Sequence, residues 1–170
     1  MERVSKAFWL WCQFADTDME FLRNIQSQVN KKFQGPKFEI HLTLLGPIMI
    51  IDKERVRTVR QKCDKLNPFK VYPLGYSFSS SFFTSLFIEI KKSKNLSNFR
   101  KEFSDISPLG LRTNYMPHVS LMYGNFQKDE KRKLITNLLG LRKSFTIDKV
   151  CIVDVNEDDF VWKITNRFNL

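Results

Sequence analysis

The amino-acid sequence predicts one α+β domain, residues 1–170, built from two similar lobes. A length of 170 residues is that of a single ordinary domain. Short apolar runs typical of strands alternate with amphipathic stretches typical of helices, and turn residues join some strands into hairpins. Each half of the chain also contains a helix, a proline-containing turn, a strand with one histidine, a second helix and paired strands, which indicates an internal repeat.

The elements are predicted in the order strand, helix, strand, helix, two strands, helix, strand, helix and a closing hairpin. Asp16, Thr17 and Asp18 supply N-cap candidates for the first helix. Gly35 and Pro36 end that helix. Helices are expected over residues 16–33, 52–66, 95–103 and 128–139, and a loop over 107–114. Strands are expected over residues 7–14, 38–45, 69–78, 82–91, 117–123, 145–155 and 160–168. We expect two antiparallel or mixed sheets, flanked by helices around a central cleft.

Composition excludes several kinds of function. The closest glycines, Gly35 and Gly46, are so far apart that neither a dinucleotide-binding glycine loop nor a P-loop can be written. The 3 cysteines contain no C-x-x-C pair, so we expect no zinc site and a reducing compartment. No apolar run is long enough to cross a bilayer and the N-terminus lacks a signal-peptide core, so we expect a cytoplasmic protein without a membrane partner.

The charge balance favours an anionic partner. The chain carries 28 Lys and Arg against 18 Asp and Glu, a net charge of +10. Such an excess steers polyanions toward a protein. The basic residues are spread along the sequence, however, so solvated helix faces explain them as well as an anion-binding surface does.

The most informative feature is a repeated tetrapeptide. The 2 histidines of the chain each open the same pattern, His41-Leu42-Thr43-Leu44 and His118-Val119-Ser120-Leu121. Side chains alternate along a strand, so each histidine shares a face with the hydroxyl two residues later, while the apolar residues face the core. If the two lobes are related by a pseudo-twofold axis, both polar faces meet across one cleft.

Two imidazoles and two hydroxyls around one small substrate suit phosphodiester hydrolysis. A neutral imidazole can act as general base on water or a ribose hydroxyl, and a protonated one can give its proton to the leaving oxygen. Thr43 and Ser120 can donate hydrogen bonds to the non-bridging phosphate oxygens. This chemistry requires no metal and no cofactor.

With these motifs the sequence resembles the two-histidine (2H) phosphoesterases, whose signature is a pair of H-x-S/T-hydrophobic motifs. The resemblance covers nearly the whole chain, and within the superfamily it is greatest to the cyclic nucleotide phosphodiesterases. Three segments carry this second similarity, FQGPKF at 33–38, FFTSLF at 82–87 and NYMPHVSLMY at 114–123. The sequence departs from the plant-type cyclic nucleotide phosphodiesterases at two positions. They have proline where this chain has Ile40, and glutamine where it has Thr84.

The resemblance implies a bilobal fold with a water-filled cleft. It also implies the opening of 2′,3′-cyclic phosphates, or of ADP-ribose 1″,2″-cyclic phosphate, by a metal-free acid–base pair. His41 and His118 match the catalytic histidines of the family, and Thr43 and Ser120 match its phosphate-binding hydroxyls. Substrate-binding positions are expected at Trp11, Phe83, Thr84, Tyr115 and Tyr123.

We therefore expect a monomeric, metal-independent phosphodiesterase acting on a nucleotide or oligonucleotide with a cyclic or 2′,5′ phosphodiester, RNA ends included. In the simplest scheme His118 activates water and His41 protonates the departing ribose oxygen, and the two can exchange these roles. Two alternatives stay open. One is an enzyme of the same superfamily that degrades 2′,5′-oligoadenylate or cyclic oligonucleotide signals. The other is an RNA-binding module that uses the cleft without catalysis.

Overall fold

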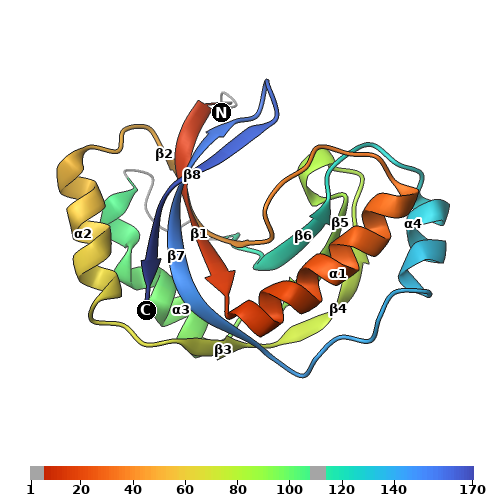
Figure 1. Cartoon of the computed structure of the whole chain (residues 1–170), viewed down its shortest axis with the longest axis horizontal. Helices are drawn as coiled ribbons and strands as arrows, with labels where there is room; N and C mark the ends of the chain where they lie inside the picture. Colours follow the sequence, from red (N-terminus) through yellow and green to blue (C-terminus); the bar gives the residue numbers. More distant parts are fainter. Residues whose placement is uncertain (1–5, 108–113) are drawn as a thin grey trace.

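A computed structural model describes residues 6–107 and 114–170 of the chain (Figure 1). The predicted order of elements is confirmed within this part. The loop predicted over 107–114 lies, apart from its two ends, outside the described residues, as does the N-terminal segment 1–5. The strands are β1 (Lys6–Phe14), β2 (Leu42–Ile48), β3 (Phe69–Val71), β4 (Pro73–Phe78), β5 (Leu86–Ile90), β6 (His118–Met122), β7 (Phe145–Asn156) and β8 (Val161–Asn169). The helices are α1 (Asp16–Lys32), α2 (Lys53–Cys63), α3 (Lys94–Glu102) and α4 (Lys128–Ile135), with short 3-10 turns η1 (Phe82–Thr84) and η2 (Ser104–Ile106).

The strands form one antiparallel sheet with two arms. Its order is β3-β7-β1-β2-β6-β5-β4, and β8 pairs with β7 outside this path. The two predicted sheets are therefore continuous, because β2 and β6 join through the single pair Leu42 and Val119. In Figure 1 one arm holds β1, β7 and β8 and the other holds β4, β5 and β6, and the arms diverge from this junction. The predicted bilobal α+β fold is confirmed.

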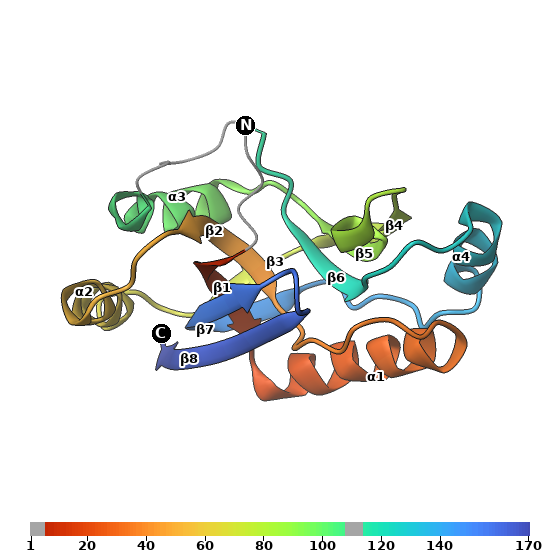
Figure 2. The same ribbon diagram turned by 90° about the horizontal axis from the view of Figure 1, so that it is seen from above.

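The helices are divided between the lobes out of sequence order. In Figures 1 and 2, α2 and α3 lie beside the first arm, whereas α1 and α4 lie beside the second. Helix α1 directly follows β1 of the first arm, yet it packs against β6 of the second. Neither lobe is therefore a continuous half of the chain.

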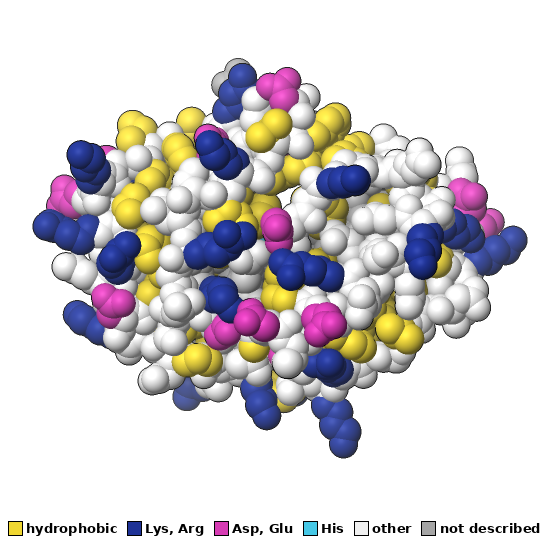
Figure 3. All heavy atoms as spheres, in the orientation of Figure 1, with side chains coloured by type: hydrophobic (Ala, Val, Ile, Leu, Met, Phe, Trp, Pro, Cys, Tyr) yellow, Lys and Arg dark blue, Asp and Glu magenta, His cyan; other side chains and the backbone are white. Residues whose placement is uncertain are grey.

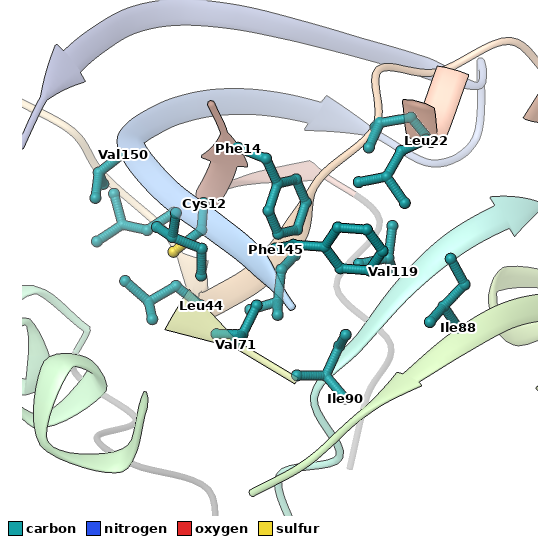
Figure 4. Close-up of a cluster of buried hydrophobic side chains, with 14 of the residues drawn as sticks. Cys12, Phe14, Leu22, Leu44, Val71, Ile88, Ile90, Val119, Phe145 and Val150 are labelled. Atoms are coloured by element: carbon teal, nitrogen blue, oxygen red, sulfur yellow. The ribbon is translucent and has the colours of Figure 1, made fainter. Parts of the chain in front are cut away.

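The apolar pattern of the sequence explains the core. Leu22, Ile25 and Val29 recur at helical spacing along α1 and are fully buried. The leucines and the valine of the repeated tetrapeptide, Leu42, Leu44, Val119 and Leu121, are buried as their strand alternation predicts. Figure 4 shows side chains of both arms meeting in this cluster, with Phe14 and Phe145 from the first arm and Ile88 and Val119 from the second.

Two local predictions are wrong. Ala15 is the N-cap of α1 and provides no side-chain cap. The Asp18 carboxylate instead accepts hydrogen bonds from the backbone N–H of Thr146 at 2.8 Å and from Arg142 at 2.7 Å, which ties α1 to the start of β7. The second strand was expected from residue 38 but begins at Leu42. The preceding segment runs past the end of β6, where a Cβ on Gly35 would clash with the Tyr123 carbonyl oxygen, so only glycine fits.

Other boundaries shift by a few residues. The strand expected over 69–78 is broken into β3 and β4, and η1 replaces the start of the strand expected from residue 82. Helices α2 and α4 end earlier than predicted, at Cys63 and Ile135. In the described part of the chain, none of the helices combines the length and the apolar character needed to cross a bilayer.

Candidate active site

A cavity of about 320 Å³ lies between the two arms of the sheet. Each of the nine residues predicted for the site lines it, so residues from β1, β2, η1, β6 and the segments beside β6 are brought together. The complete lining is Trp9, Trp11, His41, Thr43, Leu44, Leu45, Gly46, Phe83, Thr84, Arg100, Asn114, Tyr115, Met116, His118, Ser120, Tyr123, Val155, Glu157 and Trp162. The volume is at the lower end of the range for small-molecule sites and suits about one nucleotide.

The junction between β2 and β6 places the two motifs beside each other. The strands are antiparallel, and Leu42 pairs with Val119. Continued by one residue in either direction, this register sets His41 opposite Ser120 and Thr43 opposite His118. Leu42 and Val119 are both buried in the core, so the four polar side chains share the opposite face. In this register each imidazole stands across the junction from the hydroxyl of the other motif.

Both imidazoles are anchored in the same way. The Nδ1 atom of His41 donates to the backbone carbonyl of Glu39 at 2.6 Å, and Nδ1 of His118 donates to the carbonyl of Met116 at 2.8 Å. In each case the acceptor is two residues before the histidine. A donor at Nδ1 fixes the tautomer of the neutral ring and leaves Nε2 as the nitrogen that can exchange protons in the cavity.

The surroundings of the two imidazoles differ. His41 is only 4% exposed and stacks flat on Trp11, with ring centroids 3.4 Å apart and planes 3° from parallel. Burial lowers the pKa of His41 to about 3, and nearby His118 contributes in the same direction. His118 is half-buried against the edge of Phe87, and burial lowers its pKa as well. Both rings are therefore neutral at pH 7 in the free protein.

Ser120 contacts η1 and lies near Tyr123. Its hydroxyl donates to the Phe83 carbonyl at 3.5 Å, and Tyr123 lines the same cavity. The Tyr123 ring stacks on Phe38 at 3.9 Å, and burial raises the pKa of Tyr123. Tyr123 therefore forms part of the cavity wall.

Tyr115 also binds the backbone of the first motif. Its hydroxyl donates to the Thr43 carbonyl at 2.8 Å. Arg100, which sequence reasoning missed, donates from Nε to the neighbouring Leu44 carbonyl at 2.9 Å and lies 4.0 Å from the Tyr115 ring centroid. The sequence feature that could have indicated Arg100 is its position on the apolar face of α3, beside Leu96 and Phe99. A basic residue on such a face needs buried hydrogen-bond acceptors.

The closing hairpin supplies two further lining residues that sequence reasoning missed. Trp162 of β8 lies 5.4 Å from Tyr123 and 6.5 Å from Phe83, measured between ring centroids. Glu157 follows β7 at the tip of the hairpin and is half-buried. The sequence indicates them only through strand alternation in the closing hairpin: Cys151, Val153 and Val155 of β7 pack in one cluster with Trp162 of β8, and Val155 and Trp162 of this cluster line the cavity.

The titratable groups of the site suit proton transfer. Within residues 6–107 and 114–170, no three His, Cys, Asp or Glu side chains lie close enough together to hold a metal ion. The three cysteines, Cys12, Cys63 and Cys151, are buried and unpaired by disulfides. The cavity thus combines two imidazoles able to accept or donate a proton with two hydroxyls able to bind an anion.

Comparisons with known proteins agree with this geometry. The profile described as the 2′-5′ RNA ligase superfamily matches residues 15–159. A cyclic phosphodiesterase of Arabidopsis thaliana is 22% identical over 167 residues, which cover 94% of this chain and 91% of the relative. The crystal structure of E. coli LigT with 3′-AMP is similar in fold, with a TM-score of 0.62 at 9% identity over 98% of this chain and 99% of that one. Kluyveromyces marxianus Usb1 gives a TM-score of 0.53 at 14% identity over 98% of each chain. The chain belongs to the 2′-5′ RNA ligase superfamily, the two-histidine phosphoesterases, and is a phosphodiesterase of that family.

Proposed function

We propose that the protein hydrolyses cyclic phosphates of nucleotides, either 2′,3′-cyclic nucleotides or ADP-ribose 1″,2″-cyclic phosphate, without a metal ion. The observation that carries this proposal is the identical anchoring of two imidazoles, each through Nδ1 to a backbone carbonyl, at one cavity that also contains Thr43 and Ser120. The Arabidopsis relative is a cyclic phosphodiesterase, and its similarity extends over most of both chains, which supports the same substrate class.

In the proposed reaction a water oxygen attacks phosphorus as the bond from phosphorus to one ribose oxygen breaks. The neutral imidazole of the pair takes a proton from the water, and the protonated imidazole gives its proton to the departing ribose oxygen. The products are a phosphomonoester and a free ribose hydroxyl. The negative charge of the bound phosphate raises the pKa of the adjacent imidazoles, so the pair takes up the one proton that it needs when substrate binds.

The remaining groups stabilise charge and hold the reacting groups in place. The hydroxyls of Thr43 and Ser120 donate to the non-bridging oxygens, where charge increases in the transition state. The Phe83 carbonyl accepts from the Ser120 hydroxyl in the free protein, and Trp11 holds the His41 ring flat against its own. The indole face also favours the protonated form of that ring.

The test is phosphorus NMR of the purified protein with EDTA, against 2′,3′-cyclic mononucleotides, ADP-ribose cyclic phosphate, 2′,5′-oligoadenylate and cyclic dinucleotides. We expect a new phosphomonoester resonance from a cyclic phosphate, and its position identifies the bond that broke. A His118→Ala protein serves as the control for contaminating activity. Turnover that requires an added divalent ion, or no turnover while RNA still binds, would contradict the proposal.

A second candidate substrate is an oligonucleotide end, a 2′,5′-linked one included. A shallow depression of about 360 Å³ lies beside the cavity and shares Trp162 with it. Lys37 and Phe38 line this depression, so it offers a positive charge and an aromatic ring to a further nucleotide. Arg23 lines it as well, but is ion-paired with Glu39 of the same lining at 3.1 Å. Over the face in Figure 3, Lys and Arg side chains are dispersed among acidic ones, which favours a local site over a long RNA-binding surface. Preferred turnover of 2′,5′-oligoadenylate over 2′,3′-cyclic mononucleotides would select this candidate.

A further inference from the structure

Helix α4 contributes a buried lysine that the proton-transfer groups do not need. Lys131 is 1% exposed and is one of the largest fully buried side chains among the described residues. Lysine is almost never fully buried unless its charge is paired. In the described part of the chain, the ammonium is paired not with a carboxylate but with oxygen atoms of Ser79 and Ser85. The burial of this charge therefore points to the segment that carries the two serines.

The ammonium binds both ends of one loop. Ser79 and Ser85 are the first and last residues of the segment between β4 and β5, residues 79–85, which contains η1 and which we call the η1 loop. The Nζ atom of Lys131 donates to the Ser79 carbonyl at 2.8 Å, to the Ser85 hydroxyl at 3.1 Å and to the Ser85 carbonyl at 3.4 Å. An ammonium has three donors and no acceptor, so these oxygen atoms use its full capacity. Helix α4 lies on the side of the second arm away from the first arm in Figures 1 and 2, so the lysine holds the loop from outside the cleft.

Within the η1 loop, the Ser79 side chain connects these ends to the residues that line the cavity. Its hydroxyl donates to the Thr84 carbonyl at 2.8 Å, lies 2.8 Å from the Thr84 hydroxyl and accepts from the backbone N–H of Ser81 at 3.1 Å. Phe83 and Thr84 line the cavity, and the Phe83 carbonyl accepts from the Ser120 hydroxyl at 3.5 Å. The loop therefore links a lysine of α4 to one wall of the cavity.

We infer that Lys131 is a positioning residue for the phosphodiesterase reaction, which holds the η1 loop so that Phe83 and Thr84 form a wall of the substrate cavity. Lys131 itself is outside the cavity lining, so it acts through the loop and not on the substrate. Without the ammonium, the Ser79 carbonyl and the Ser85 hydroxyl lose this donor and the loop loses its hydrogen bonds to α4. Substrate binding then has to order the loop, at a cost in affinity. The inference rests on the proposed function only for the substrate with which it is measured.

The experiment measures kcat and KM of Lys131→Met for a 2′,3′-cyclic mononucleotide, because methionine retains most of the length of the side chain and removes the ammonium. We expect KM to rise about tenfold and kcat to fall less than about threefold, since binding is weakened while both histidine motifs are intact. A lysine that only stabilised the fold would instead lower the amount of active protein, and with it kcat, and would leave KM unchanged. Lys133→Met makes the same change on the exposed side of α4 and should leave both constants unaltered.

A second variant tests the same contact from the loop. Ser85→Ala removes one of the three acceptors and should raise KM about threefold or less, and combined with Lys131→Met it should have no further effect, because both changes break one contact. It also tests the inference if the Lys131→Met protein does not fold, in which case an unchanged KM in Ser85→Ala would overturn it.

Hydrogen exchange gives a measurement that does not depend on turnover. The amide of Ser79 donates to the Ser85 carbonyl and that of Ser81 to the Ser79 hydroxyl. Both should exchange about tenfold faster or more in Lys131→Met and at the normal rate in Lys133→Met, because local opening exposes the amides of a released loop.

An unchanged KM in a folded Lys131→Met protein, whatever the exchange rates, would overturn the inference. If the wild-type protein opens no cyclic phosphate, the proposed function fails, and KM is then measured with whichever phosphodiester of the same panel is turned over. If none is turned over, exchange alone decides the role of Lys131. Unchanged exchange of the η1 loop would reject that role, and faster exchange confined to the loop would support it.

Discussion

The two histidine motifs have the same backbone anchoring but different surroundings. Both rings donate from Nδ1 to a carbonyl two residues earlier, and both lie where β2 meets β6. His41, however, is enclosed and stacked on Trp11, whereas His118 is half-buried and contacts only the edge of Phe87 among the aromatic rings of the described residues. The short repeated pattern thus determines how each ring is oriented, while distant parts of the chain determine how readily it is protonated.

Removing either ring should have the largest effect. We expect His41→Ala and His118→Ala each to lower kcat by about 10³-fold or more, because each removes one proton-transfer group. The double variant should be little worse than either single one, since the two rings act as a unit. Circular dichroism and the thermal midpoint check that the fold persists. Retention of more than a tenth of the activity in a folded single variant would refute the acid–base pair.

Removing the hydroxyls should have a smaller effect and should separate the two motifs. Thr43→Val and Ser120→Ala are each expected to lower kcat by about 10²-fold, the usual loss for one donor to a developing oxyanion. Tyr123 lines the same cavity as Ser120, and Tyr123→Phe tests whether its hydroxyl acts through that serine. If it does, the variant should reproduce part of the Ser120→Ala loss and leave the contribution of Thr43 intact. Steady-state kinetics of single and double variants give the coupling. Additive losses for Tyr123→Phe and Ser120→Ala would show that the tyrosine does not act through the serine.

The pH dependence of kcat/KM should show that the protonated imidazole, and not the neutral one, is in short supply. Burial lowers the pKa of both histidines below 6.5, that of His41 to about 3, so above pH 6.5 both rings are neutral in the free protein. The reaction needs one protonated ring, so kcat/KM should rise as pH falls from 8 to below 6.5 and should decline about tenfold per pH unit on the alkaline side. The profile is measured with substrate far below KM. A maximum above pH 8 would contradict this order of pKa values.

The aromatic partners should have the smallest effect. Trp11→Phe removes part of the flat contact with His41 and is expected to lower kcat severalfold, with KM nearly unchanged, because the ring is oriented less firmly. Phe87→Leu is the matched change at His118 and should have less effect, since only a ring edge touches that imidazole. The contrast between the two kcat values is the measurement. Equal losses would mean that the difference in stacking has no catalytic consequence.

Much of this site could be predicted from the sequence because strand alternation is local. The alternation in His41-Leu42-Thr43-Leu44 and in its counterpart assigns one face to the core and the other to the cleft, and the structure agrees. The contribution of Arg100 could not be predicted, because it depends on a carbonyl 56 residues away. Glu157 and Trp162 were missed for the same reason, since only the pairing of β7 with β8 and β1 brings them to the cavity.

The crossing of α1 has a consequence for how the molecule can be divided. Helix α1 is encoded next to β1 but covers the second lobe, and β7, near the other end of the chain, completes the sheet of the first. Each lobe therefore needs helices and strands from both halves of the polypeptide. A chain cleaved between the two halves should for this reason remain associated as one folded molecule.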